Sequence, residues 1–278
     1  MLKLPVGFNY NKTAVKTLKL AETSGEAEKV FVKRPGKTEL YTWFSEIIAV
    51  AVESVQDVRV ASEFIKSGVV PSVIKKIPLV DAGSLLLQIH IEAWQDTMGE
   101  QELICKYCGH IFERDIDLKK IEIPFDENDE IPEFIDVVLD KTYEINADGV
   151  EKFADIHGMK YNMIRYRVPL LGDGIANEGL ASDEVEFWRN ISFTCQEGLY
   201  FVEKGENGYA IVDSIPSEYA MGMGKRLYNS TFTTKSLKLI REKLQTSLKS
   251  APLYYRDKCP SCNRLTPHIA AVENFFSA

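Results

Sequence analysis

Two Cys-x-x-Cys pairs that lie far apart in the chain constrain the fold more than any other feature of the sequence. The first pair is in Cys105-Lys-Tyr-Cys108 and the second in Cys259-Pro-Ser-Cys262. Cysteines at this spacing can direct two thiolates at one metal ion from a tight turn, and four thiolates complete a closed tetrahedral zinc site. Each pair is followed by a residue that readily adopts a left-handed backbone, Gly109 or Asn263. The sequence therefore predicts that all four cysteines bind one structural zinc ion, which ties the middle of the chain to its C-terminal part.

The long separation of the two pairs does not exclude a shared site. Residues 109 to 258 lie between them. Loop-closure entropy grows only logarithmically with loop length, so closing this loop costs on the order of 4–5 kcal/mol. A structural zinc ion contributes roughly 10–16 kcal/mol of apparent binding free energy, which outweighs that cost.

Other roles for the cysteines stay open at this point. Each pair could be a redox dithiol, although neither lies clearly at the strand-to-helix junction that lowers a thiol pKa. Each pair could instead bind its own metal ion, with His110 completing the first site and His268 the second. The fifth cysteine, Cys195, lies in an apolar segment and is interpreted as a small buried side chain. Five cysteines in a chain of this length do not indicate a disulfide scaffold.

Hydrophobic periodicity predicts an α+β fold that carries the split zinc knuckle site of four cysteines described above. The expected order is a helical N-terminal region, a β-rich middle and a C-terminal helix. Four regions follow from this reading: residues 1–36 as an N-terminal arm with one or two short strands, 37–125 as a helical region with the first cysteine pair, 126–233 as a β-rich middle region, and 234–278 as a C-terminal helix with the second pair.

Individual elements follow from the spacing of apolar residues. Helices are expected from Thr38 to about Val55, from about Asp57 to Lys66, after Asp81 up to about Gly99, and from Leu237 to Leu248. Asp81 is expected to cap the third helix, whose nearly continuous apolar start predicts that it is buried. Strands are expected as a hairpin within residues 103–123 and at residues 163–171, 184–195, 199–203 and 209–212.

Charge and hydropathy indicate which partners to expect. The 41 acidic and 33 basic residues give a net charge of -8, which repels a phosphate backbone unless basic residues cluster on one face. The closest candidates are the pairs at residues 75–76, 119–120 and 225–226, so a nucleic-acid partner is not expected. The N-terminal segment lacks a signal-peptide pattern, and the apolar stretch Ile47–Val52 is too short to cross a bilayer. A soluble protein with no membrane partner is expected.

Three weaker motifs were considered as sites. Glu144 to Asp155 has oxygen ligands at offsets similar to an EF-hand, but the first and last ligand types are exchanged. The segment Gly222–Arg226 lacks the spacing of a phosphate-binding loop. His90 with Glu92 or Asp96 could suggest a hydrolase, but no nucleophile is apparent, so His90 is interpreted as a core histidine. No catalytic residue is predicted, and the protein is not expected to be an enzyme.

One set of residues between Glu39 and Ile123 forms a recognisable pattern: Asp81, Leu85-Leu86-Leu87, Ile89, Trp94, Gly99, Cys105-Lys-Tyr-Cys108-Gly109 and Asp115-Ile-Asp117-Leu118. With a looser match at Leu4-Pro5-Val-Gly7 and at Cys259-Pro-Ser-Cys262 followed by Phe275-Phe276, this pattern resembles the T-even-type baseplate hub-assembly or bridging family of contractile-tailed bacteriophages. The arginine usual in the family's third helix is replaced by His90 or Glu92, and the β-rich middle has no match.

This resemblance implies a non-enzymatic virion protein of the tail baseplate. Its partners would be other baseplate, hub or tape-measure proteins, reached in part by the N-terminal arm, and the zinc ion would hold the fold rigid. The alternative is a zinc-ribbon nucleic-acid-binding or transcription-associated protein, which requires a basic face.

Overall fold

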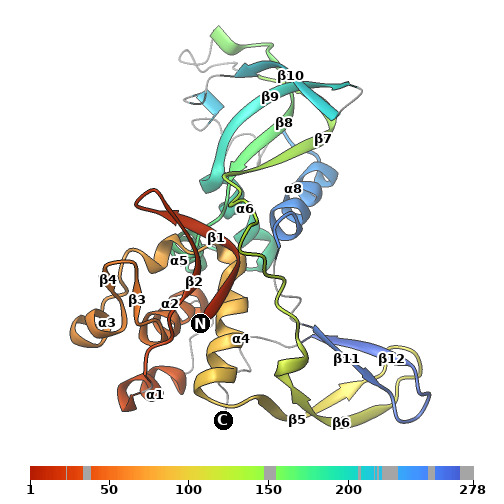
Figure 1. Cartoon of the computed structure of the whole chain (residues 1–278). Coiled ribbons are helices and arrows are strands. Elements are labelled where there is room, and N and C mark those ends of the chain that lie inside the picture. Colours follow the sequence, from red (N-terminus) through yellow and green to blue (C-terminus); the bar gives the residue numbers. More distant parts are fainter. Residues whose placement is uncertain are drawn as a thin grey trace. The chain divides into compact units, whose positions relative to one another are not determined.

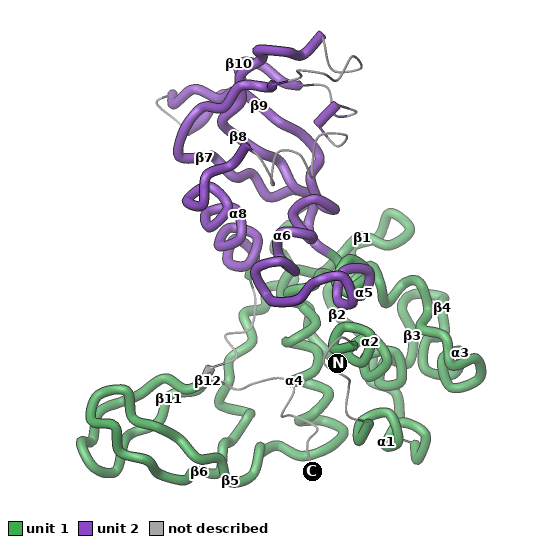
Figure 2. Tube along the Cα trace, turned by 180° about the vertical axis from the view of Figure 1, so that it is seen from behind, with its two compact units in different colours: residues 1–131, 170–175, 249–278 green, residues 132–169, 176–248 purple. Residues whose placement is uncertain are grey.

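The computed structural model describes residues 1–22, 24–33, 39–146, 155–205, 208–215, 217, 219–220, 231–249 and 254–269. The chain forms two compact units, which interrupt each other along the sequence (Figure 2). Unit 1 contains residues 1–131, 170–175 and 249–278, and unit 2 contains residues 132–169 and 176–248. Helices and strands are both abundant, which confirms the predicted α+β class.

Unit 1 is built around two buried helices that pack against each other, α2 (Leu40–Ala51) and α4 (Leu79–Ala93) (Figure 1). The prediction of a buried third helix is confirmed, because Leu85, Leu86 and Leu87 are each 0 % exposed. Smaller helical elements surround this pair: α1 (Gly25–Phe31), α3 (Ala61–Ser67) and the 3-10 turns η1 (Ile74–Lys76) and η2 (Leu118–Lys120). No helix in the described ranges is both long enough and apolar enough to span a membrane.

The predicted boundaries of the first three helices are wrong. The third helix ends at Ala93 rather than near Gly99, which lies in strand β5 (Thr97–Ile104). The first helix ends at Ala51 rather than near Val55, because the chain turns there into the short antiparallel pair β3 (Ser54–Val55) and β4 (Val58–Arg59). Gln56 stands in the turn with a φ of 50°, which is incompatible with continuing a helix. The second helix therefore begins only at Ala61.

The segment expected as an N-terminal arm starts with a hairpin that packs on α4. Strands β1 (Leu2–Tyr10) and β2 (Thr13–Leu18) are antiparallel, and the side chains of Leu2, Leu4, Val6 and Phe8 are all buried. Over these residues the chain is part of the core of unit 1 rather than an irregular arm. Residues 34–38 lie outside the described part of the chain.

Asp81 holds this hairpin and does not cap α4. Its carboxylate accepts hydrogen bonds from the backbone N–H groups of Val6 (3.0 Å) and Gly7 (2.8 Å). Gln88, further along α4, bonds the N–H (2.7 Å) and the carbonyl (2.8 Å) of Lys3. Burial raises the pKa of Asp81 to about 6, although the two backbone donors and Lys16 act in the opposite direction. The predicted capping role is wrong because α4 begins two residues earlier, directly after Pro78.

Two further hairpins in unit 1 lie side by side (Figure 1). One consists of β5 (Thr97–Ile104) and β6 (Ile111–Asp117), which confirms the hairpin predicted around the first cysteine pair. The other consists of β11 (Tyr254–Lys258) and β12 (Leu265–Ile269) around the second pair. Each is a separate two-stranded antiparallel sheet.

Unit 2 is a four-stranded antiparallel sheet in the order β10-β9-β8-β7, with α8 packed on β7. Its elements are β7 (Phe134–Glu144), β8 (Lys160–Arg167), α6 (Glu184–Cys195), β9 (Gln196–Gly205), β10 (Gly208–Ile215) and α8 (Thr234–Thr246). In helix α5 (Leu171–Glu178), residues 171–175 belong to unit 1 and residues 176–178 to unit 2. Most of the EF-hand-like segment, residues 147–154, lies outside the described part of the chain. The segment Gly222–Arg226 lies wholly outside it.

Residues 184–195, predicted as a strand, form helix α6 instead. Asp183 caps the helix by accepting a hydrogen bond from the Glu186 N–H (2.8 Å), and Glu186 in turn accepts from the N–H and hydroxyl of Ser182 (both 2.8 Å). The buried side chains Phe187, Ile191 and Cys195 recur every fourth residue. The helical capping box outweighs the β-favouring aromatic and branched residues of this segment.

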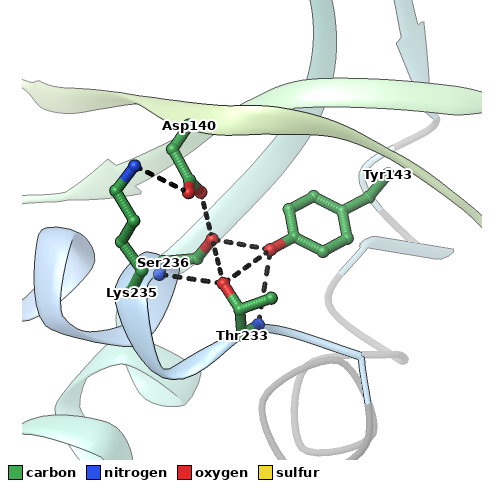
Figure 3. A network of polar contacts seen from close by, with 5 residues as sticks. All are labelled: Asp140, Tyr143, Thr233, Lys235 and Ser236. Atoms are coloured by element: carbon green, nitrogen blue, oxygen red, sulfur yellow. Dashed lines mark hydrogen bonds and ion pairs between the residues drawn. The ribbon is translucent and has the colours of Figure 1, made fainter.

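A partly buried polar cluster fixes the start of α8 against β7 (Figure 3). Thr233 caps the helix by accepting from the Ser236 N–H (3.2 Å). The Ser236 hydroxyl donates to Asp140 (2.6 Å) and lies 2.6 Å from the Tyr143 hydroxyl, while Lys235 pairs with the other Asp140 oxygen at 3.3 Å. The hydrogen bond from Ser236 lowers the pKa of Asp140. Every oxygen in the cluster is thus used to position a helix.

Candidate metal centre

The turn between β5 and β6 has the backbone of a metal-binding knuckle. The N–H of Cys105 donates to the carbonyl of His110 (2.9 Å), and the N–H of Gly109 donates back to the carbonyl of Cys105 (2.9 Å). Gly109 has a φ of 70°, and the Tyr107 N–H points at the Cys105 sulfur at 3.4 Å. This turn places both sulfurs, of Cys105 and Cys108, on its inner side.

The turn between β11 and β12 repeats the same pattern. The N–H of Cys259 donates to the carbonyl of Arg264 (3.0 Å), and the N–H of Asn263 donates to the carbonyl of Cys259 (2.8 Å). Asn263 has a φ of 57°, so the predicted left-handed residue after each pair is confirmed in both turns. Two equivalent knuckles thus present two cysteines each.

The four sulfurs converge on one point. The Cys105 sulfur lies 3.7 Å from that of Cys262, and the Cys108 sulfur lies 3.6 Å from that of Cys259. All four lie within 4.8 Å of one another, and none is in a disulfide. A tetrahedron with zinc–sulfur bonds of about 2.3 Å has edges of about 3.8 Å. The Cys105–Cys262 and Cys108–Cys259 distances are close to this edge, and the remaining ones stay within 4.8 Å. The cluster can therefore hold a metal ion of tetrahedral thiolate preference.

The neighbours of the cluster favour the thiolate at Cys105 and oppose it at Cys108. The Thr266 hydroxyl, 3.5 Å from the Cys105 sulfur, is the main cause that lowers the pKa of Cys105 to about 6. The pKa of Cys108 is raised, against the lowering effect of the His110 backbone, by burial and by the three other thiols. Four thiolates this close repel one another, so complete deprotonation of the cluster requires a cation among them.

The cluster joins two hairpins that otherwise meet through a few side chains, among them the rings of Phe112 on β6 and His268 on β12, whose centroids lie 6.0 Å apart. Cys105 and Cys259 are each 1 % exposed, whereas Cys262 is half-buried and Cys108 exposed. Away from the sulfurs, Arg114 on β6 pairs with Asp257 on β11 at 2.8 Å across the exposed surface. A metal ion at the four sulfurs would therefore be the strongest tie between the hairpins.

Neither histidine beside the knuckles belongs to the cluster. The potential metal-binding group found among the described residues consists of the four cysteines. His110 is exposed and stacks on Phe112 at 6.2 Å, while His268 stacks on Tyr255 at 5.4 Å. Burial lowers the pKa of His268. One site shared by both pairs fits this geometry better than two separate sites with histidine ligands.

Two of the remaining candidate residues, Cys195 and His90, lie in the core, whereas Asp96 lies on the surface. Cys195 is 0 % exposed at the end of α6, buried as expected, although on a helix rather than a strand. His90 is likewise 0 % exposed, which confirms it as a core histidine, and its Nε2 lies 3.3 Å from the carbonyl of Thr97. Burial lowers the pKa of His90. Asp96 is engaged on the surface by Lys119 at 2.6 Å.

An aromatic ring with two cations beside it lies at the ends of the two cysteine turns, and the sequence did not predict it. The Tyr107 ring is 49 % exposed, with Lys106 at 5.0 Å and Arg264 at 5.3 Å from its centroid. Residues 104–111 and 258–266 contain no acidic residue, although the chain has 41. That local lack of carboxylates was visible in the sequence, but the contact between the two tips exists only in the fold.

The arrangement of the cluster favours structure over catalysis. With four protein ligands, the coordination shell of a tetrahedral ion is complete and leaves no position for a substrate.

No protein family model, no curated protein and no solved structure matches the chain.

Proposed function

We propose that Cys105, Cys108, Cys259 and Cys262 bind one structural zinc ion in a non-enzymatic virion protein of a contractile phage tail baseplate. The observation that supports the zinc site most strongly is the convergence of four sulfurs within 4.8 Å from segments about 150 residues apart. The place in a baseplate, between the hub or tape-measure region and the surrounding subunits, rests on the resemblance of residues 39–123. A closed metal site agrees with a structural role but does not identify a phage.

The zinc ion would cross-link the two cysteine-bearing hairpins of unit 1. The strands β11 and β12 have five residues each, too few to be stable as an isolated hairpin. A structural zinc ion contributes roughly 10–16 kcal/mol of apparent binding free energy, far more than an exposed ion pair provides. Binding would hold the C-terminal hairpin against β5–β6 and give a partner protein a rigid surface.

Metal analysis tests the zinc proposal directly. Protein purified without chelators should contain about one zinc per chain, and cobalt substitution should give the absorption bands of tetrahedral thiolate coordination. Cys262→Ser should lose the metal, whereas Cys195→Ala, the matched control outside the cluster, should keep it. A metal-free wild-type protein, or a Cys262→Ser variant with full zinc content, would contradict the proposal.

The baseplate assignment has its own test. Quantitative mass spectrometry of purified particles, from the phage whose genome encodes the chain, should find it in a fixed ratio to baseplate proteins. Tape-measure or baseplate genes should flank its gene. If the protein were absent both from mature particles and from assembly intermediates, the proposed virion role would be wrong. The zinc proposal would not be affected by that result.

One observation favours the nucleic-acid alternative. The exposed Tyr107 ring between Lys106 and Arg264 combines an aromatic surface with two cations, the combination that binds single-stranded nucleic acid. Binding of a fluorescent single-stranded oligonucleotide should then weaken in the Lys106→Glu/Arg264→Glu variant, but not in Lys66→Glu on α3. Absence of binding at low salt would exclude this alternative, because phosphate contacts are strongest there.

A further inference from the structure

A groove between α6 and α8 in unit 2 has the chemistry of a ligand site. It encloses a cavity of about 240 Å³. This volume lies just below the range of about 300–1,000 Å³ that is typical of small-molecule sites. The groove is separate from the cysteine cluster, which belongs to unit 1.

The walls of the groove are apolar. Trp188 of α6 and Leu237 of α8 are half-buried, and Ile240 lies deeper at 1 % exposure. Val185, at 59 % exposure, extends the apolar surface outward on α6. An aliphatic chain or a single aromatic ring in this space would cover side chains that are now in contact with water.

The polar residues of the groove are selectively cationic. Arg189, Lys238 and Arg241 line it, and no carboxylate is among the lining residues. Arg189 pairs with Glu186 at 3.3 Å and Lys238 with Glu242 at 3.6 Å, whereas no ion pair of Arg241 is found within the described ranges. With Glu186 and Glu242 counted against the three cations, the groove keeps a net charge of about +1. This charge suits a ligand that carries one negative charge.

Arg189 also has an unused donor. Its Nε–H is buried and has no acceptor among the described residues, although Nη2 is bonded to Glu186. A buried donor without a partner is costly, so a rotation of the Arg189 side chain that brings its Nε–H to a bound oxygen would be favourable. Guanidinium groups are well suited to carboxylate oxygens in such positions.

We propose that the α6–α8 groove binds a small amphiphilic carboxylate. The apolar body would lie against Trp188, Leu237 and Ile240. The carboxylate would pair with the guanidinium groups of Arg189 and Arg241, which both line the groove. This role is independent of the metal site and of any place in a virion.

Three matched probes of equal chain length test the proposal: octanoate, octanol and octylammonium. Each is titrated below its aggregation concentration while the indole resonance of Trp188 is followed by NMR, with Trp188→Phe to assign it. Octanoate should saturate at one site and bind about tenfold more tightly than octanol, because a charged hydrogen bond is lost in the alcohol. Octylammonium should not bind. Equal binding of octanoate and octanol, or no saturable binding at millimolar octanoate, would overturn the proposal.

Variants separate the groove from non-specific uptake. Arg241→Gln and Arg189→Gln should each weaken octanoate binding about tenfold and leave octanol unchanged, whereas Val185→Asp should weaken both. Arg256→Gln in unit 1 is the control and should bind octanoate normally. Circular dichroism checks that each variant is folded. If Arg241→Gln and Arg189→Gln both folded and bound octanoate like the wild type, the groove would not be the site.

Discussion

The N-terminal and C-terminal hairpins of unit 1 are attached to the same unit by different means. The β1–β2 hairpin buries Leu2, Leu4, Val6 and Phe8 and is held by the carboxylate of Asp81. The β11–β12 hairpin is shorter and contributes two cysteines to the shared cluster. A hairpin with enough apolar side chains can rely on the core, whereas a five-residue hairpin needs a stronger local tie. The two hairpins should therefore respond to different perturbations.

Loss of the metal should have the largest effect and should act on one hairpin. We expect Cys262→Ser, or treatment of the wild type with a chelator, to release the β11–β12 hairpin and to loosen the knuckle at Cys105. The reason is that most of the roughly 10–16 kcal/mol supplied by a structural zinc ion is lost. Hydrogen exchange should accelerate at residues 254–269 and 103–111.

The β1–β2 hairpin is the internal reference for that experiment. Its amides should exchange at the same rate with and without the metal, because its contacts are apolar side chains and Asp81. Equal acceleration in both hairpins would show that the metal stabilises unit 1 as a whole, and the contrast between the hairpins would fail.

The Asp81 attachment should have a signature in the pH dependence of stability. The pKa of Asp81 is about 6 in the folded state and 3.8 for an ordinary aspartate. Between these values the folded protein keeps a proton that the unfolded chain has released, so stability falls as the pH rises through this window and levels off above it. A shift of this size corresponds to about 3 kcal/mol.

Asp81→Asn should remove that pH dependence. We expect the free energy of unfolding of the wild type to fall by about 2 kcal/mol more than that of the variant between pH 4 and pH 7, because part of the full effect is already lost at pH 4. Urea denaturation of both proteins across this pH range measures the difference between their free energies of unfolding. The effects of other titrating groups cancel in that difference. Parallel pH profiles for the two proteins would show that the Asp81 carboxyl titrates normally.

These two attachments differ in how far they could be predicted from the sequence. The cysteine site was predictable because its chemistry is local: two cysteines and a turn residue identify each knuckle. Asp81 was assigned to a cap because its partners, Val6 and Gly7, are about 75 positions away and no sequence pattern connects them. The turn of the β1–β2 hairpin was also hard to recognise, because Asn11 and Lys12 both have positive φ and no glycine marks the site.

Helix α6 shows a different kind of error. Its Phe, Trp, Ile and Val residues favour a strand by composition and predict the wrong element. The contrary signal, the spacing of Ser182, Asp183 and Glu186, was present in the sequence as a capping box. This capping box predicts a sheet with helices in place of a β-rich middle, and two of those helices line the α6–α8 groove.

Within the N-terminal hairpin, Gly7 offers a more local test of the Asp81 attachment. Gly7 has a φ of 75°, and a Cβ there would lie 2.7 Å from the carbonyl oxygen of Val15. Gly7→Ala should therefore cost about 2 kcal/mol of unfolding free energy in urea denaturation. Gly68→Ala on the surface after α3 also has positive φ but no close neighbour, so it is the matched control with a smaller loss. Equal losses would mean that strain alone, and not the close approach, matters at Gly7.

The smallest effect is expected at the ion pair that joins the two cysteine-bearing hairpins away from the metal. Arg114 and Asp257 lie 2.8 Å apart, but their side chains are 45 % and 34 % exposed. Exposed pairs contribute about 0.2–1 kcal/mol, so a double-mutant cycle with Arg114→Gln and Asp257→Asn should give a coupling energy in this range with zinc bound. The coupling should shrink in high salt because of screening. A coupling of several kcal/mol would mean that the hairpins are held by their side chains as well as by the metal, and the C-terminal hairpin would then resemble the N-terminal one more than its length suggests.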